Sequence, residues 1–358
     1  MWRKTFQIIG IIAAVMSLLP LLAADYWWIR VFDFPHLQFT GFTLLAIILY
    51  FFTFKPKWIN DYFYIVILLG CFSFQLYRFI DYTPFFPEEV QTSSEDIATE
   101  NMVSIYTANL LQKNKESQPL FEEIREKQPD IIVFTEANKR WSNLIKSNIG
   151  SSYTYKIEEP LENTYGMLVY SKFELVDGVV KYRVDPEIPS IDAKVKLRNG
   201  ALVQLHAIHP TPPMPQHNPR STDRDKELMQ IAFASKESEL PVIVIGDFND
   251  VAWSDSTQLT KTVGKLLDVR IGRGFYNTYH AQYPIFRWSL DHILTSSEFR
   301  LKNLGTGVDF GSDHFPYWAI LSFEPELSKE QKPEEPSKTE LQQAMDQMNK
   351  KDSSKNEN

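Results

Sequence analysis

The sequence predicts a mixed α/β domain that follows about three transmembrane helices. Long apolar runs occupy the first 82 residues, short β-rich runs alternate with helical stretches from Met102 onward, and polar residues dominate after Pro325. The averages over all 358 residues, 44% hydrophobic and 23% charged, are those of an ordinary soluble protein and conceal these differences. The chain is therefore neither one uniform domain nor wholly disordered.

The amino-terminal region, residues 1–82, contains three apolar runs. Residues 5–24 carry no charge and are long enough to span a hydrocarbon core of about 30 Å, and residues 37–54 and 62–79 are nearly as long. The first run alone would also fit a signal peptide, because Arg3 and Lys4 precede it. Three successive runs favour three spanning helices and an anchor in the lipid bilayer.

Basic residues predict how these helices are oriented. Arg3 and Lys4 precede the first run, Lys55 and Lys57 lie between the second and the third, and the segment after the third is acidic. The positive-inside rule then places the amino terminus in the cytoplasm and the rest of the chain on the extracytoplasmic side. Residues 83–100, rich in Pro, Ser, Glu and Thr, are predicted to be a linker.

The middle segment, residues 101–325, alternates strand and helix patterns. Short β-rich apolar runs predict strands, and longer amphipathic stretches predict helices. The strands are expected at 103–109, 130–135, 167–171, 193–197, 202–206, 242–246, 291–295 and 318–323, and the helices at 119–127 and 224–236. Mixed elements over about 225 residues indicate one layered domain.

Composition excludes several classes of protein and describes the end of the chain. Cys71 is the only cysteine and lies in an apolar run, which excludes intramolecular disulfides, zinc fingers and a cysteine nucleophile. The net charge of −8 argues against a nucleic-acid packaging protein. Residues 326–358 have helical propensity but almost no apolar stripe, so we expect a solvated, disordered tail.

Acidic, amide and imidazole side chains recur where the predicted strands end, at the edge where a sheet exposes them to a cleft. They are Asn109, Glu136, His209, Asp247, Asn249, Asp291, Asp313 and His314. Carboxylates and an amide without cysteine suit a hard cation such as Mg²⁺ or Mn²⁺. Imidazoles beside carboxylates suit proton transfer and the stabilisation of negative charge. Together these groups fit metal-assisted attack of water on phosphorus.

Each residue also has a simpler structural explanation, such as a turn for Asn109 or a helix N-terminal charge for Glu136. The order of the whole set is more informative than any member. It resembles the endonuclease/exonuclease/phosphatase superfamily, which includes deoxyribonucleases, abasic-site endonucleases, neutral sphingomyelinases and inositol-polyphosphate phosphatases. The resemblance covers residues 101–323 and depends on Gly-Asp-Phe-Asn at 246–249, Ser-Asp-His at 312–314 and Asp291 between them.

This resemblance implies a four-layer α/β sandwich, in which helices flank two packed central β-sheets. It also implies that Glu136 is the principal metal ligand, with Asn109 beside it and Asp313 completing the metal side. Asp247 and Asn249 are implied to orient or activate the attacking water and to hold a phosphate oxygen.

The resemblance further implies that His314, paired with Asp291, contacts the phosphate and shuttles protons. His209 is similar to the deoxyribonuclease-type histidine that assists the leaving group, and Glu159 to the carboxylate that orients it. Leu111 stands where some members carry a further metal-ligating Asp. Abasic-site enzymes have a tyrosine where His209 stands, so an abasic endonuclease is disfavoured.

The sequence leaves the substrate open. A nucleic acid is one class of phosphate ester, and a phospholipid is the other, because the expected anchor brings the domain to a bilayer. A catalytically inactive membrane receptor or scaffold is a third interpretation, although the complete set of site residues argues against it. Arg220 and Arg224 either clamp substrate phosphates or begin a surface helix. The sequence identifies no protein partner.

Overall fold

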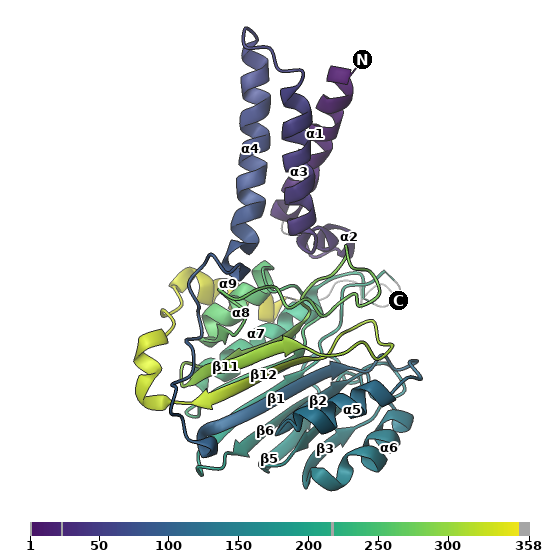
Figure 1. Ribbon diagram of the computed structural model, residues 1–358, viewed down its shortest axis with the longest axis vertical. Coiled ribbons are helices and arrows are strands. Elements are labelled where there is room, and N and C mark those ends of the chain that lie inside the picture. The colour runs from purple at the N-terminus through teal and green to yellow at the C-terminus, as the bar shows by residue number, and fades with distance from the viewer. Residues whose placement is uncertain (1, 23, 216–217, 351–358) are drawn as a thin grey trace.

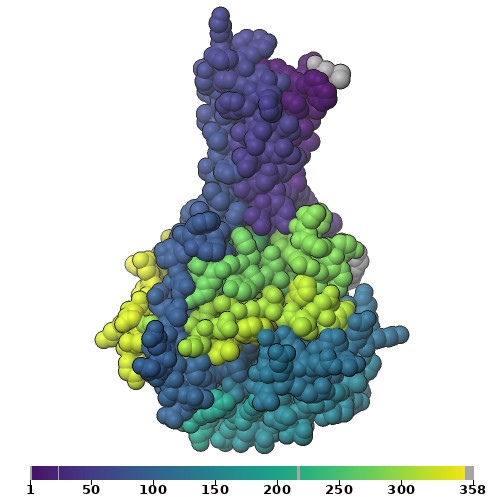
Figure 2. Space-filling view, viewed as in Figure 1, coloured from purple at the N-terminus to yellow at the C-terminus, as the bar shows by residue number. Residues whose placement is uncertain are grey.

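The computed structural model describes residues 2–22, 24–215 and 218–350, which form a helical stalk and an α/β domain (Figure 1). The stalk consists of α1 (Trp2–Leu18), extended by the 3₁₀ turn η1 (Leu19–Leu22), together with α3 (His36–Phe51) and α4 (Ile59–Phe79). The short helix α2 (Trp27–Arg30) and the 3₁₀ turn η2 (Val31–Asp33) lie at its base. The space-filling view shows this base resting directly on the domain (Figure 2).

The stalk helices have the length and composition of membrane spans. Trp2–Leu22 and Ile59–Tyr82 are each long and apolar enough to cross a bilayer. The segments Trp27–Asp33 and His36–Phe51 meet at an angle of 74° and supply a third span if they are counted as one broken helix. The bend coincides with Pro35, which has no backbone N–H to donate and whose ψ of 34° lies outside the helical region. The sequence prediction of three spans thus corresponds to two helices and a bent pair.

Polar side chains inside the stalk are paired with one another. Gln75 donates to Ser17, and Thr43 Oγ1 donates to Gln75 Oε1 at 3.4 Å, all three being buried. Arg3 Nη1 donates to Asp61 Oδ2 at 2.9 Å near the end of the stalk that is far from the domain. Such pairing holds helices together where water is scarce.

Two six-stranded sheets form the centre of the domain. The strand order in the first sheet is β11 (Phe299–Thr306), β12 (Tyr317–Phe323), β1 (Met102–Asn109), β2 (Ile131–Thr135), β4 (Met167–Ser171) and β3 (Tyr155–Glu159). In the second sheet it is β5 (Glu174–Lys181), β6 (Ser190–Lys196), β7 (Leu202–Ile208), β8 (Val242–Asp247), β10 (Asp291–Thr295) and β9 (Leu267–Asp268). The eight predicted strands correspond to members of these sheets.

The two sheets pack face to face and helices cover their outer faces. One apolar core joins residues such as Ile105 and Val133 of the first sheet to Leu205 and Ile245 of the second. Helices α5 (Gln118–Lys127) and α6 (Lys139–Asn148) pack on the first sheet. Helices α7 (Thr222–Glu237) and α8 (Asp255–Gly264) pack on the second. The predicted α/β sandwich of two central sheets flanked by helices is confirmed.

The chain on either side of the domain departs from the sequence prediction. Residues 326–350 are not a solvated extension: after the 3₁₀ turn η6 (Pro325–Gln331), helix α9 (Lys338–Asn349) buries Ala344 against the α7–α8 layer, with Leu341 and Met348 beside it. These three residues form a short apolar stripe at i, i+3 and i+7 that the charged surroundings obscure. Residues 351–358 lie outside the described part of the chain.

The predicted linker is also packed on the domain. Val90 is fully buried in the core between the sheets, and Ser93 donates to Ser322 Oγ at 2.7 Å. Thr92 forms a parallel bridge with Leu301 of β11. The backbone groups of this segment therefore find partners on the edge of the first sheet, and the segment is no free tether.

A buried ion pair connects the second sheet to the base of the stalk. Arg270 donates to both carboxylate oxygens of Asp268, at 3.0 and 2.8 Å, and its guanidinium lies over the rings of Tyr82 and Tyr317. Burial opposes ionisation of Asp268, but Arg270 outweighs burial and lowers the pKa of this carboxyl to about 2. The pair is fully enclosed.

Replacing Arg270 by alanine leaves the Asp268 carboxylate buried without its partner, so we expect Arg270→Ala to lower the free energy of unfolding by about 3–5 kcal/mol. Lys265→Ala is the control, because Lys265 pairs with the largely exposed Glu335 and should cost about 1 kcal/mol or less. Denaturant unfolding of the detergent-solubilised chain measures both. Equal losses in the two variants would contradict a stabilising role for the buried pair.

Candidate active site

The site forms where two pairs of parallel strands end. β1 runs parallel to β2 in the first sheet, and β7 runs parallel to β8 in the second. Asn109 and Asp247 are the last residues of β1 and β8, while Glu136 and His209 follow β2 and β7 within one residue. Because the sheets pack face to face, these carboxyl ends meet at one edge of the sandwich.

Two further segments close the site from the antiparallel strands. Asp291 begins β10 and stands opposite Asp247 in the strand register. Asp313 and His314 lie in the loop before β12, where Ser312 Oγ donates to the carbonyl oxygen of Asn109 at 2.7 Å. This bond fixes the loop against the end of β1.

The amide of Asn109 joins carboxylates from the two sheets. Its Nδ2 donates to Glu136 Oε1 and to Asp247 Oδ2, each at 3.0 Å. The backbone N–H of Gln112 donates to Glu136 Oε2 at 3.2 Å, and that of Asn249 donates to Asp247 Oδ1 at 2.9 Å. Burial raises the pKa of both carboxyls. The fixed amides therefore hold two acidic groups side by side at the end of the sheets.

Two imidazoles face Asp247. His314 Nδ1 is 2.8 Å from Asp291 Oδ2, and its Nε2 is 3.6 Å from Asp247 Oδ2. Burial lowers the pKa of His314, but the carboxylates of Asp291 and Asp247 outweigh burial and raise it to about 10. His209 Nε2 is 3.8 Å from the same oxygen of Asp247, and burial lowers the pKa of this second imidazole. The surroundings thus favour the charged form of the His314 ring and the neutral form of the His209 ring.

The acidic residues fit a divalent cation. Glu136, Asp247 and Asp313 bring carboxylates to one cleft, and the buried Asp313 Oδ1 has no hydrogen-bond partner among the residues that the structure describes. Asp247 is buried and Glu136 and Asp313 are partly buried, so this set of carboxylates needs a compensating charge, and oxygen ligands suit Mg²⁺ better than softer metals. One oxygen or nitrogen from each of Asp247, Asp291 and His314 also lies within 4.8 Å of the others. His314 and Asp291 already share a hydrogen bond, so we favour Glu136, Asn109 and Asp313 as the metal side.

The cleft above these groups has a volume of about 450 Å³. Tyr165 and Tyr279 flank its two imidazoles, with ring centroids 5.4 Å from His209 and 4.9 Å from His314 respectively. The opposite wall comes from outside the α/β domain. It is formed by residues 27–34, here called the elbow, of which Trp27, Arg30, Val31 and Phe34 line the cleft.

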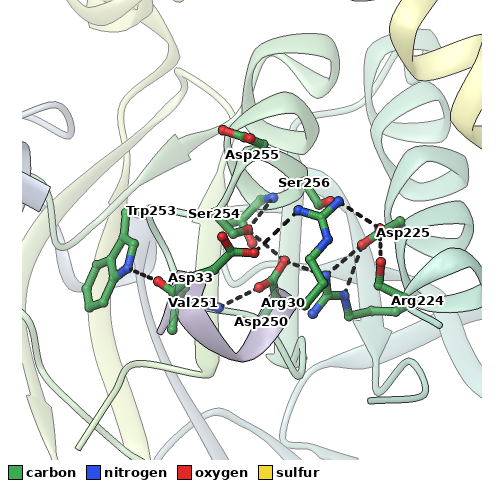
Figure 3. A network of polar contacts seen from close by, with 12 residues as sticks. Arg30, Asp33, Arg224, Asp225, Asp250, Val251, Trp253, Ser254, Asp255 and Ser256 are labelled. Atoms are coloured by element: carbon green, nitrogen blue, oxygen red, sulfur yellow. Dashed lines mark hydrogen bonds and ion pairs between the residues drawn. The ribbon is translucent and has the colours of Figure 1, made fainter. Parts of the chain in front are cut away.

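Buried ions hold the loop that follows β8 (Figure 3). Arg224 donates to the carbonyl oxygen of Asn249 at 3.0 Å and contacts Asp250 Oδ2 at 3.1 Å and Asp225 Oδ1 at 2.8 Å. Its side chain is only 1% exposed, so it is no phosphate clamp: it organises the loop. Arg220 instead lies over the ring of Tyr26 and donates to its hydroxyl at 2.8 Å.

The cleft contains most of the residues singled out in the sequence. Those that line it are Asn109, Glu136, His209, Asp247, Asn249, Asp313 and His314, and Asp291 supports His314 from beneath. Glu159 is different, because it ends β3 in an edge strand and bonds to Tyr182, away from the residues described around the cleft. The structure therefore does not bring Glu159 together with His209: Tyr165, a few residues further on, contacts that imidazole.

Two sets of residues that line the cleft, two tyrosines and the elbow, were not identified from the sequence. Tyr165 and Tyr279 occupy irregular segments without any periodic pattern. The elbow lies between two apolar runs, where its aromatic residues fit a membrane interface equally well. Arg30 and Asp33 could have indicated the role of the elbow, because charged residues between adjacent spanning helices usually form ion pairs with other parts of the protein.

The sequence matches the model of the endonuclease/exonuclease/phosphatase family over residues 106–314. The chain belongs to this family. That range begins in β1 and ends at His314, so it contains all of the residues assigned to the site. A search of curated proteins found no match.

Solved structures share the fold at low sequence identity. D. rerio TDP2 in complex with a single-strand DNA product aligns with a TM-score of 0.52 and 16% identity, over 62% of this chain and 99% of that one. An endonuclease/exonuclease/phosphatase protein from Bacteroides vulgatus gives 0.52 and 19% over the same shares. The human Nocturnin catalytic domain with bound sulfate gives 0.50 and 15%, over 63% and 96%. These likenesses support the fold, and the family supports a phosphoester hydrolase.

Gly246 permits the close approach of β7 and β8 beneath the site. Its φ of +140° suits glycine alone, and a Cβ there would lie 2.1 Å from the carbonyl oxygen of Ile208. We expect Gly246→Ala to cost more than the roughly 1–3 kcal/mol of backbone strain, because β7 must also move. Gly200→Ala is the matched control, with a φ of +88° and open space around it. Denaturant unfolding compares them, and an equal cost would show that the contact with Ile208 is unimportant.

Proposed function

We propose that this protein is a membrane-anchored, Mg²⁺-dependent phosphoesterase that cleaves phosphodiester or phosphomonoester bonds by attack of water. The observation that carries the proposal is the meeting of buried and partly buried carboxylates, amides and two imidazoles at one cleft. Membership of the endonuclease/exonuclease/phosphatase family supports the reaction class. The apolar stalk supports the anchor.

The metal side of the cleft would consist of Glu136, Asn109 and Asp313. A cation held there would polarise a phosphate oxygen and offset the charge that develops on it. Asn109 already bridges Glu136 and Asp247, so it links the metal side to the acid–base side. The buried Oδ1 of Asp313 accepts no hydrogen bond within the described part of the chain and would serve as a ligand.

The remaining residues of the cleft have different roles in proton transfer and in binding the phosphate. Asp247 is the acceptor nearest to both imidazoles and orients the attacking water. Positively charged His314, held by Asp291, stabilises the negative charge on the phosphate. Neutral His209 serves the leaving group, and Asn249 Nδ2 keeps one N–H for a phosphate oxygen while the other donates to Pro210.

Removing the central groups should abolish activity without unfolding the chain. We expect Glu136→Gln and His314→Gln each to lower the rate of bis-p-nitrophenyl phosphate hydrolysis by about 10²–10⁴-fold. Glu159→Gln is the matched control and should keep the wild-type rate, because its side chain lies outside the cleft. Loss of activity in the control alone would refute this assignment of the site.

Metal removal tests the cation directly. We expect EDTA to stop hydrolysis and Mg²⁺ to restore it in the wild type, because the buried carboxylates need a compensating charge. Glu136→Gln should need a higher Mg²⁺ concentration for half-maximal rate. Full activity in EDTA would exclude the proposed metal. Absence of hydrolysis with either Mg²⁺ or Mn²⁺ would favour an inactive binding protein.

The orientation can be tested with single cysteines in a Cys71→Ser background. The α/β domain and the α3–α4 connection lie at opposite ends of the stalk (Figure 1). We expect a membrane-impermeant maleimide to label Asn199→Cys in intact cells, and Lys57→Cys only after permeabilisation, because both positions are exposed. The reverse pattern would place the catalytic domain in the cytoplasm.

A further inference from the structure

The cleft has a polar floor and an apolar wall. Carboxylates and imidazoles occupy the floor, whereas Trp27, Val31 and Phe34 of the elbow face it together with Pro213 and Met214. Val31 is 50% exposed, Met214 45% and Trp27 37%. Contact of these apolar side chains with water is unfavourable, and an apolar ligand that covers them would remove it.

The apolar wall is fixed to the catalytic loop by buried charges (Figure 3). Arg30 contacts Asp33 Oδ2 at 3.3 Å and Asp225 Oδ2 at 3.9 Å, and Asp225 also binds Arg224, which holds the loop at Asn249. The indole of Trp253 donates to the carbonyl oxygen of Asp33 at 2.8 Å. The wall therefore has a defined position relative to the floor, as a binding surface requires.

The elbow also lies at the level where the stalk would leave a bilayer. It connects the first spanning helix to α3, and Trp27 and Trp28 are partly exposed, as expected of rings at a membrane interface. On the His314 side, exposed Ile285 and Phe286 belong to the loop that carries Tyr279, and Gln38 of α3 donates to the carbonyl oxygen of Ile285 at 2.7 Å. The apolar surfaces beside the cleft are thus continuous with the stalk.

The charges in the cleft suit one phosphate rather than a phosphate polymer. Among the described residues that line it, Arg30 is the one lysine or arginine, and its guanidinium is engaged by Asp33 and Asp225. A nucleic acid strand needs several cationic contacts along its backbone, which this lining lacks. A lipid presents a single phosphate ester joined to an apolar body.

From these observations we infer that the substrate is a phospholipid of the membrane that holds the enzyme. Its phosphate lies on the polar floor, and the apolar part next to the phosphate lies against Val31, Trp27 and Met214. This inference rests on the proposed hydrolase activity and adds the substrate class to it. The elbow residues bind substrate and determine specificity, and the reacting groups remain those of the floor.

The test uses the full chain reconstituted in vesicles of phosphatidylcholine. Each vesicle preparation carries phosphatidylglycerol, phosphatidylethanolamine, phosphatidic acid or sphingomyelin, and water-soluble phosphate released from the lipid is measured. The soluble comparison is the deacylated counterpart, glycerophosphoglycerol, at the same phosphate concentration. We expect at least one of the four lipids to be cleaved, and phosphatidylglycerol, if cleaved, to react about tenfold or more faster than glycerophosphoglycerol.

Variants of the wall separate binding from chemistry. We expect Val31→Asn and Met214→Gln each to slow lipid hydrolysis about tenfold and to slow bis-p-nitrophenyl phosphate hydrolysis by a clearly smaller factor, because both side chains belong to the apolar wall and lie outside the catalytic floor. Val179→Asn is the control: the residue is 42% exposed on β5 and should change neither rate.

The outcomes distinguish the two proposals. Hydrolysis of bis-p-nitrophenyl phosphate without hydrolysis of any of the four lipids would overturn the substrate class and leave the hydrolase intact. Faster cleavage of single-stranded DNA than of every lipid, or equal losses on both substrates in Val31→Asn, would likewise overturn it. Failure to cleave any substrate with Mg²⁺ or Mn²⁺ would overturn both.

Discussion

The face-to-face packing of the two β-sheets is the constraint on which the site depends. Each sheet contributes one parallel pair, and the apolar core between the sheets brings the carboxyl ends of the two pairs to the same edge. Asn109 from the first sheet can bond Asp247 from the second only because this core fixes their separation. A shift of either sheet would separate the amide from the carboxylate, so core packing and site geometry are one property.

Much of this arrangement could be predicted from the sequence, because the pattern of apolar residues indicates the strands and the polar residues at strand ends indicate the site. Apolar runs such as 131–134 and 242–245 are typical of buried strands, and the polar residues that follow them mark the open edge of a sheet. The resemblance to a known family then implied that the strands form two packed sheets flanked by helices. Edge strands such as β5, which is largely exposed and contains Gly178, and the two-residue β9 have too weak a pattern to be found.

The site was less predictable where tertiary contacts determine which side chains reach the cleft. Glu159 and Tyr165 are close in sequence and equally plausible neighbours of an imidazole, and only the folded structure shows that Glu159 bonds to Tyr182, which follows β5. The elbow could not be recognised as part of the cleft, because its partners Asp225 and Trp253 are about 200 residues away. The sequence is compatible with Arg224 as a phosphate clamp or as the start of a surface helix, and in the fold it is a buried structural ion.

The packed segment before β1 limits which fragments of this enzyme can fold without the stalk. A soluble fragment that begins at residue 100 and stops at 325 would discard Val90, which is buried in the core, and Gln331, whose amide caps the edge of β11 at Phe299. Such a fragment would expose an apolar seam and aggregate. A fragment cut near residue 87 and ending at 350 keeps both, yet it loses the elbow. Solubility and the complete cleft therefore cannot be obtained together by truncation.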